Sequence, residues 1–201
     1  MMPIVAVVAA YLLGSIPFGY LLVKVMTGSD VRSSGSGNIG ATNVLRTTGR
    51  LPAILTLLLD IGKGYLAVWL AGLLTANDLL WTSASAVAVV FGHAFPVFLK
   101  FKGGKAVASF IGAFLRLTPI PLLAVLIVFV VTVAVTRYIS LGSILAAGMF
   151  PFAVWLILHP PLVMVIAAAI CGALVVFRHR ANISRLRAGS ENVFSFRGAK
   201  R

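Results

Sequence analysis

"AVASFIGAFLRLTPIPLLAVLIVFVVTVAVT", residues 106–136, is the apolar stretch whose interpretation decides the topology of the chain. A helix crosses a bilayer with about 20 mainly apolar residues, so this stretch is too long for one ordinary span. Arg116 and the segment "TPIP" (118–121) interrupt it at its middle, and closely spaced prolines favour a turn. The sequence therefore predicts two spans, at 106–118 and 120–136, of which the first is short for a crossing.

The composition of the whole chain is typical of an integral membrane protein. Of its 201 residues, 60% are hydrophobic and 10% are charged, which is far outside the balance of a soluble domain. The first apolar segment lacks a basic leading region and a polar cleavage region, so we predict a retained span rather than a signal peptide. Five further segments have the length and hydropathy of membrane spans: 3–23, 52–75, 80–99, 141–158 and 161–177.

The basic residues predict the orientation of the chain, because Lys and Arg near helix ends accumulate on the cytoplasmic side. With two spans in 106–136, every Lys and Arg except Lys63 and Arg116 falls on one side. With a single span there, the basic tail from Arg178 to Arg201 would face away from the first loop. We therefore predict an all-α membrane protein with seven transmembrane helices, an outside N-terminus, a cytoplasmic C-terminus and no internal repeat.

The first polar loop, "SGSGNIGATNVLRTTGR" (34–50), has the composition of an anion-binding segment. Its glycines let the backbone approach a ligand and point successive N–H groups at an anion. Arg46 can grip a phosphate with its planar guanidinium. The alternative is a flexible loop whose arginines contact anionic lipid headgroups. Hydroxyl and amide contacts would come from four further side chains: Ser36, Asn38, Thr42 and Asn43.

The segment "GHAFPVFLKFKGGKA" (92–106) places two glycines and Lys105 where the next helix should begin. A helix N-terminus offers free N–H groups and a partial positive charge, which suit a phosphate. The segment is not a nucleoside-triphosphate loop of the GxxxxGK[ST] type. Leu99 stands where that motif has its first Gly, and Ala106 where it has a hydroxyl.

Two further polar stretches would lie on the same face, "RYISLGS" (137–143) and "RHRANISRLRAGSEN" (178–192). In the second, His179 and Asn182 are spaced three residues apart, as on one face of a helix. Glu191 is expected to cap, or to pair with, a basic neighbour. Within the spans, Asp60 and Lys63 are expected to form an intramembrane ion pair.

Three of these segments together resemble the bacterial acyl-phosphate-dependent glycerol-3-phosphate acyltransferases, the PlsY family. They are "SGNIGATNVLR" (36–46), "GHAFPVFLKFKGGKAVA" (92–108) and "HRANISRLRAGSE" (179–191), in the family's order and spacing. The resemblance covers nearly the whole chain. It implies a single transmembrane acyltransferase domain over 1–201 that transfers a fatty acyl group from acyl phosphate to the 1-hydroxyl of sn-glycerol 3-phosphate. The products would be lysophosphatidic acid and phosphate, in the first acylation of phospholipid synthesis.

The resemblance also implies roles for individual residues. Thr42 and Asn43 would contact either substrate, while Gly103, Gly104 and Ser143 would lie around the phosphate of the donor. Ala106 stands where the family usually has Gly. A positive φ there would strain Ala, whereas a first helical residue would not, and we expect the second. Glycerol 3-phosphate would be held by five residues: Ser36, Arg46, Lys105, His179 and Asn182.

The sequence leaves the general base open. A His beside a carboxylate usually deprotonates a hydroxyl in acyl transfer, but none of the four acidic residues lies near His93 or His179 in the sequence. His93 could be a packing residue, a donor to the oxyanion or the base. We favour a mechanism in which a phosphate oxygen of the donor takes the proton while Lys105 and backbone N–H groups stabilise the developing charge.

The resemblance and the positions of the basic residues indicate the partners and the location. The expected partners are glycerol 3-phosphate, acyl phosphate and membrane lipids, with no metal, no cofactor, no nucleic acid and no obligatory protein partner. The expected location is the bacterial cytoplasmic membrane, with the active site on the cytoplasmic face. The competing interpretation is a small-anion or phospholipid transporter, although such proteins commonly have duplicated halves and a site at the midplane. A nucleic-acid-binding protein is less consistent with the sequence, because its basic residues lack an aromatic stacking pattern.

Overall fold

The computed structural model is all-helical, as predicted, and describes residues 1–194. Arg197, Lys200 and Arg201 of the basic tail lie outside the described residues. Two short 3-10 turns, η1 (Val31–Ser33) and η2 (Val97–Leu99), occur in loops. The α-helices are α1 (Met2–Ser15), α2 (Phe18–Thr27), α3 (Ala41–Thr47), α4 (Arg50–Leu74), α5 (Leu79–Ala94), α6 (Val107–Leu117), α7 (Pro119–Thr136), α8 (Ile139–Leu158), α9 (Leu162–Arg178) and α10 (Arg180–Arg187).

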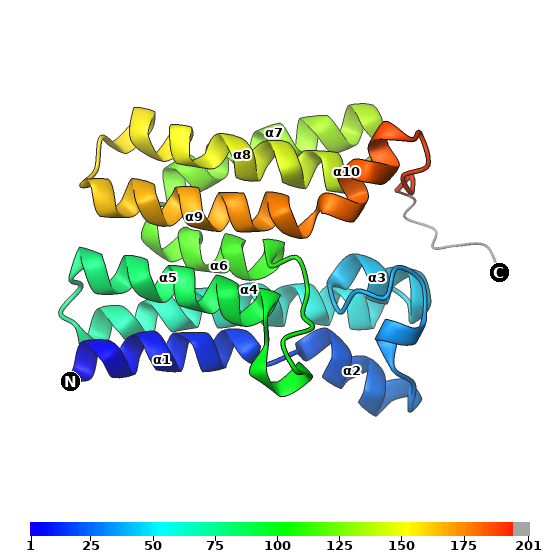
Figure 1. Ribbon diagram of the computed structural model, residues 1–201, viewed down its shortest axis with the longest axis horizontal. Coiled ribbons are helices and arrows are strands. Elements are labelled where there is room, and N and C mark those ends of the chain that lie inside the picture. The colour runs from blue at the N-terminus through cyan, green and yellow to red at the C-terminus, as the bar shows by residue number, and fades with distance from the viewer. Residues whose placement is uncertain (195–201) are drawn as a thin grey trace.

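The long helices lie side by side, and the short polar elements gather at one end of them. Figure 1 shows α2, α3 and α10 at the end of the bundle opposite to the N-terminus. The first loop and α10 therefore lie at the same end of the bundle although they are far apart in the sequence. This arrangement brings the polar segments to one face, as the sequence predicted.

Residues 106–136 form two helices, which confirms the predicted break. α6 ends at Leu117 and α7 begins at Pro119, so that Thr118 alone separates them. A proline in the first turn of a helix loses no hydrogen bond, because the N–H at that position has no helical partner. Arg116 is held outside the helical core, where its guanidinium donates to Asn77 Oδ1 at 2.9 Å.

The number of membrane spans depends on α6 and α9. α9 is long enough to cross a membrane only if it is counted together with α10, and the axes of these two helices differ by 55°. α6 has 11 residues and is about 16 Å long, roughly half of the hydrocarbon thickness. Seven spans and the orientation of the termini therefore stay predictions. Five described stretches are long and apolar enough to cross on their own: Met2–Thr27, Arg50–Leu74, Leu79–Leu99, Pro119–Thr136 and Ile139–Leu158.

The first predicted span, 3–23, contains a break. α1 ends at Ser15 and α2 begins at Phe18, because Pro17 has no N–H and disfavours a helical conformation at Ile16. The carbonyl oxygen of Ile16 accepts a hydrogen bond from Lys63 Nζ at 2.7 Å. Lys63 also lies 2.7 Å from Asp60, which confirms the predicted ion pair, and both side chains are buried.

The short helix α6 is held by close packing on two sides. Phe110 and Phe114 of α6 contact Phe150 of α8, with ring centroids 4.9 and 4.7 Å apart. On the other side α6 meets α4 through glycines. A Cβ atom added to Gly112 would collide with the carbonyl oxygen of Ile61. Small residues of this kind allow helix backbones to approach closely in membranes.

The glycine contact gives a matched pair of alanine substitutions. Gly112→Ala should destabilise the protein by about 1–3 kcal/mol, because backbone atoms of α4 must move to admit the methyl group. Gly62→Ala, on α4 with open space around its Cβ position, should leave stability unchanged or raise it slightly. Thermal unfolding of both variants in detergent tests the packing. Equal midpoints for the two variants would contradict it.

Candidate active site

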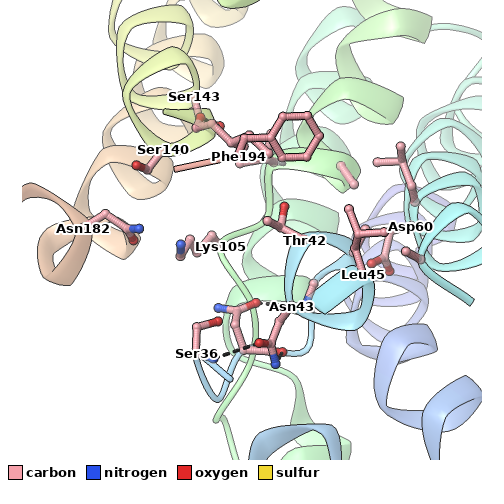
Figure 2. A pocket seen from close by; sticks show the side chains of 18 of the residues that line it. Ser36, Thr42, Asn43, Leu45, Asp60, Lys105, Ser140, Ser143, Asn182 and Phe194 are labelled. Carbon is pink, nitrogen blue, oxygen red and sulfur yellow. Dashed lines mark hydrogen bonds between the residues drawn. The ribbon is translucent and has the colours of Figure 1, made fainter. Parts of the chain in front are cut away.

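A cavity of about 540 Å³ lies between the first loop, α3, α4, α6, α8, α10 and the segment 191–194. Its wall brings together polar residues that are distant in the sequence. In Figure 2 Lys105 and Asn182 point toward each other across it. Gly103 and Gly104 are not among the lining residues and lie in the loop behind Lys105. The predicted site residues that line the cavity are Ser36, Asn38, Thr42, Asn43, Arg46, His93, Lys105, Ser143, His179 and Asn182.

Asn43 organises the first loop. Its side chain is buried, and its amide nitrogen donates to the carbonyl oxygens of Val31, Ser34 and Asn38 at 2.8–3.2 Å. Its Oδ1 accepts the backbone N–H of Ser36 at 2.8 Å. Asn38 folds the next turn in the same way, because its Oδ1 accepts the N–H of Gly40. Both amides, predicted to contact substrate, are thus engaged in shaping the loop that presents Ser36.

The cavity is strongly cationic at its polar end. Burial lowers the pKa of Lys105 to about 8, and Arg185, Arg46 and Arg178 act in the same direction against the opposing charge of Glu191. Burial also lowers the pKa of Arg46, which stays protonated because arginine is such a weak acid. Partly buried cations that repel one another favour the binding of an anion between them.

His179 and Asn182 line the cavity and carry acceptor atoms. His179 Nδ1 lies 2.7 Å from the carbonyl oxygen of Val175, which can only accept, so Nδ1 carries a proton. Burial lowers the pKa of His179 to about 4, so the ring is neutral near pH 7 and Nε2 keeps a lone pair that can accept from a ligand hydroxyl. The Asn182 amide nitrogen donates to Glu191 at 2.9 Å, while its Oδ1 has no partner among the described residues and is covered by its neighbours.

Glu191 pairs with a basic neighbour, as predicted. Its two carboxylate oxygens accept from Asn182 and from Arg185 Nε, each at 2.9 Å. Glu191 is 8% exposed, so it acts as the buried partner that orients both side chains. The segment beyond it continues along the cavity wall, where Phe194 donates its N–H to the carbonyl oxygen of Arg137 at 2.8 Å.

His93 has an acidic neighbour in space that the sequence did not reveal. Its Nδ1 lies 3.1 Å from Ser109 Oγ and 3.6 Å from Asp60 Oδ1. Its Nε2 faces Gly104, where an added Cβ would collide with it. The carbonyl oxygen of His93 accepts the N–H of Gly104 at 3.1 Å. His93 therefore packs directly beneath the loop that carries Lys105.

The expectation for Ala106 was wrong. α6 begins at Val107, and Ala106 precedes it in the left-handed region with φ of 62°. This conformation costs an L-residue about 1–2 kcal/mol. The loop must turn sharply before the helix, and the methyl group of Ala106 is completely buried, so packing compensates part of the strain.

Comparison with known proteins identifies the family of this chain. Residues 4–189 match the sequence model of the family described as glycerol-3-phosphate acyltransferase. The chain belongs to the glycerol-3-phosphate acyltransferase family. A member from Geotalea daltonii is 50% identical over 191 residues, which cover 95% of this chain and 97% of that protein. A member from Trichlorobacter lovleyi is also 50% identical, over 94% of this chain and 95% of its own length.

Two solved structures of acyltransferases are similar over nearly the whole fold. One is the crystal structure of PlsY (YgiH), an integral membrane glycerol 3-phosphate acyltransferase, in its glycerol 3-phosphate form. It is 37% identical, has a TM-score of 0.91, and covers 97% of this chain and 96% of its own. The lysophosphatidic acid form of PlsY is 35% identical, with a TM-score of 0.89 over 98% and 97% of the two chains. The acyltransferase fold is thus shared in full.

The metal-binding potential of the described chain is small. Residues 1–194 contain no group of three or more His, Cys, Asp or Glu placed to hold a metal ion. The lone cysteine, Cys171, is buried.

The pKa of Lys105 predicts a pH dependence for anion binding. Below about pH 8 Lys105 is charged, and as pH rises through that value it loses its proton. The affinity for glycerol 3-phosphate should therefore fall above pH 8, by up to about tenfold per pH unit. Titration calorimetry between pH 7 and pH 9.5 measures this change. Lys105→Arg should give a flat profile over the same range, and a wild-type profile equally flat would contradict the assignment.

Proposed function

We propose that the protein transfers a fatty acyl group from acyl phosphate to the 1-hydroxyl of sn-glycerol 3-phosphate. The products are lysophosphatidic acid and inorganic phosphate, and the reaction takes place at the cytoplasmic face of a bacterial inner membrane. The observation that carries the proposal is a single cavity whose cationic end continues into an apolar extension. Membership of the acyltransferase family supports acyl transfer to glycerol 3-phosphate.

The polar end fits glycerol 3-phosphate. Arg46 and Lys105 supply two cations for its phosphate, and Ser36 adds a hydroxyl at the tip of the first loop. His179 Nε2 is an acceptor for a glycerol hydroxyl, and Asn182 Oδ1 becomes a second one when a small turn of its side chain uncovers it. The arrangement selects a small molecule that carries a phosphate at one end and hydroxyl donors at the other.

The apolar extension fits the acyl chain of the donor. It is lined by Ile54 and Leu57 of α4, Ile111 of α6, Phe129 of α7 and Phe194. Each methylene group that leaves water for such a surface gains about 0.8 kcal/mol, so the extension keeps an acyl chain out of water as the bilayer does. The chain would lie among the helices while the phosphate of the donor stays at the polar end.

The phosphate of the donor lies best at the N-terminus of α6. Lys105, Ala106, Val107 and Ala108 line the cavity there, and the first N–H groups of a helix attract an anion. Thr42 faces the same space. Ser143 Oγ donates to the carbonyl oxygen of Ile139 at 3.0 Å, so its oxygen remains an acceptor for a protonated phosphate oxygen.

The chemical step needs no protein nucleophile. The 1-hydroxyl oxygen attacks the acyl carbon, and an oxygen of the donor phosphate takes the hydroxyl proton. The bond between the acyl carbon and the phosphate oxygen then breaks, and phosphate leaves with the proton. Lys105 and the α6 N–H groups stabilise the negative charge that develops. His93 supports this arrangement from beneath the loop, because its Nε2 faces Gly104.

A donor comparison tests the activity. Purified protein in detergent should form lysophosphatidic acid from glycerol 3-phosphate with palmitoyl phosphate, and not with palmitoyl-CoA or palmitoyl carrier protein. Lys105→Ala and Arg46→Ala should lower kcat/KM by about 100-fold or more, because each leaves buried phosphate charge unpaired. Lys100→Ala, an exposed lysine of the same loop, is the control. No product with any donor, in protein that binds glycerol 3-phosphate, would favour transport instead.

The identity of the base has its own test. If the donor phosphate takes the proton, His93→Gln should retain turnover within about 100-fold of wild type, the lower limit of a general base's contribution. The glutamine keeps a polar group beside Ser109. Rapid-quench measurement of a single turnover with both substrates bound separates chemistry from binding. If His93 and His179 variants each lost all turnover with unchanged substrate affinities, a histidine base would replace the phosphate.

A further inference from the structure

Arg178 lies at the junction of the two halves of the site. It is the last residue of α9 and directly precedes His179, but its own side chain turns to the loop that carries Lys105. Its Nε donates to the carbonyl oxygen of Gly104 at 3.0 Å, and its Nη2 donates to that of Gly103 at 2.7 Å. The planar guanidinium thus grips two successive carbonyl groups of the backbone.

These contacts determine the direction of the neighbouring N–H groups. In a trans peptide the C=O and N–H bonds point in opposite directions. The peptide between Gly103 and Gly104 is held at both ends, because its oxygen accepts from Arg178 and its N–H donates to His93. In the next peptide the oxygen of Gly104 also accepts from Arg178. The N–H of Lys105 must therefore point away from Arg178.

The guanidinium itself is held in place by an aromatic ring. Its central carbon lies 5.1 Å from the ring centroid of Phe95, a distance typical of a cation–π contact. Phe95 in turn is tied to α1, because Tyr11 donates its hydroxyl proton to the Phe95 carbonyl oxygen at 2.8 Å. The contact of Arg178 with the loop is therefore supported by Phe95 and Tyr11, neither of which lines the cavity.

We propose that Arg178 is the positioning residue of the anion-binding loop, which orients the Lys105 backbone N–H and side chain for phosphate. The inference rests on the proposed function and deepens it. Arg178 does not touch the reacting groups. It acts through the carbonyl groups of Gly103 and Gly104, which lie outside the cavity wall.

Kinetics of three variants test the role. Arg178→Ala should lower kcat/KM for glycerol 3-phosphate by about 100-fold, the effect of a displacement of about 1 Å in a positioned group. Arg178→Lys should lose less, because an ammonium group can reach one carbonyl but lacks the planar pair of donors. Arg180→Ala is the matched control. Arg180 is exposed, and its guanidinium lies 5.0 Å from the Phe177 ring centroid. The Arg180→Ala substitution should leave kcat/KM unchanged.

Chemical rescue separates positioning from general structural damage. Millimolar guanidinium ion should restore part of the activity of Arg178→Ala. It should restore no activity to Lys105→Ala, because Arg178 still holds the loop in that variant. Arg178→Ala with wild-type kcat/KM, or a folded Arg178→Ala that guanidinium leaves inactive, would overturn the proposal. If Arg178→Ala fails to fold, Arg178→Lys decides, since wild-type kinetics in that variant would exclude a two-carbonyl grip.

Calorimetry distinguishes a failure of the positioning role from a failure of the proposed acyl donor. Binding of glycerol 3-phosphate requires no acyl donor, so comparing its Kd in the wild type and in the Arg178 variants reports on the site independently of the donor. A wild type that binds glycerol 3-phosphate but makes no product from acyl phosphate would refute the proposed donor. A weakened Kd in Arg178→Ala, unchanged in Arg180→Ala, would still support the positioning role.

Discussion

The hydrogen bond and the ion pair of the buried Lys63 join α4 to the bend between α1 and α2, and the arrangement of these three helices depends on them. Pro17 interrupts the α1–α2 segment and leaves the Ile16 carbonyl without a helical partner. Within a bilayer an unsatisfied carbonyl costs several kcal/mol. Lys63 satisfies it from α4 at 2.7 Å, and Asp60 compensates the charge. Loss of Lys63 would leave the Ile16 carbonyl with only the Phe18 N–H, at 3.2 Å, and the Asp60 carboxylate without its nearest cation, at a cost of about 3–5 kcal/mol.

The same ion pair extends toward the site. Asp60 lies 3.6 Å from His93 Nδ1, and His93 supports the loop of Gly104 through its carbonyl oxygen and its ring. The contacts run from the bend in the first span, through α4 and α5, to the loop before α6. A charged pair deep in the bundle and the loop that carries Lys105 at its end are therefore parts of one polar network. Within such networks the loss of one partner affects its neighbours, because each buried group relies on the next.

The sequence predicted the features that depend on neighbouring residues. The break at Thr118 follows from local proline chemistry, and the Asp60–Lys63 pair follows from helical spacing. Contacts between distant elements were missed because no periodicity encodes them: Asp60 meets His93, and Arg178 meets Gly103 and Gly104. The positive φ of Ala106 was misjudged for a related reason. Ala is ordinary at the start of a helix, and only the path of the loop into α6 demands the left-handed turn.

The cavity wall spans almost the entire described chain, from Ser36 in the first loop to Phe194 beyond α10. The contact between the Phe194 N–H and the Arg137 carbonyl closes this wall. Membrane proteins are synthesised from the N-terminus, and their early segments fold before the late ones leave the ribosome. A nascent chain that has inserted α1 to α9 would still lack Asn182, Glu191 and the last stretch of wall. The cavity wall is therefore complete only once residues up to Phe194 have been synthesised, so a shorter nascent chain cannot form the whole wall.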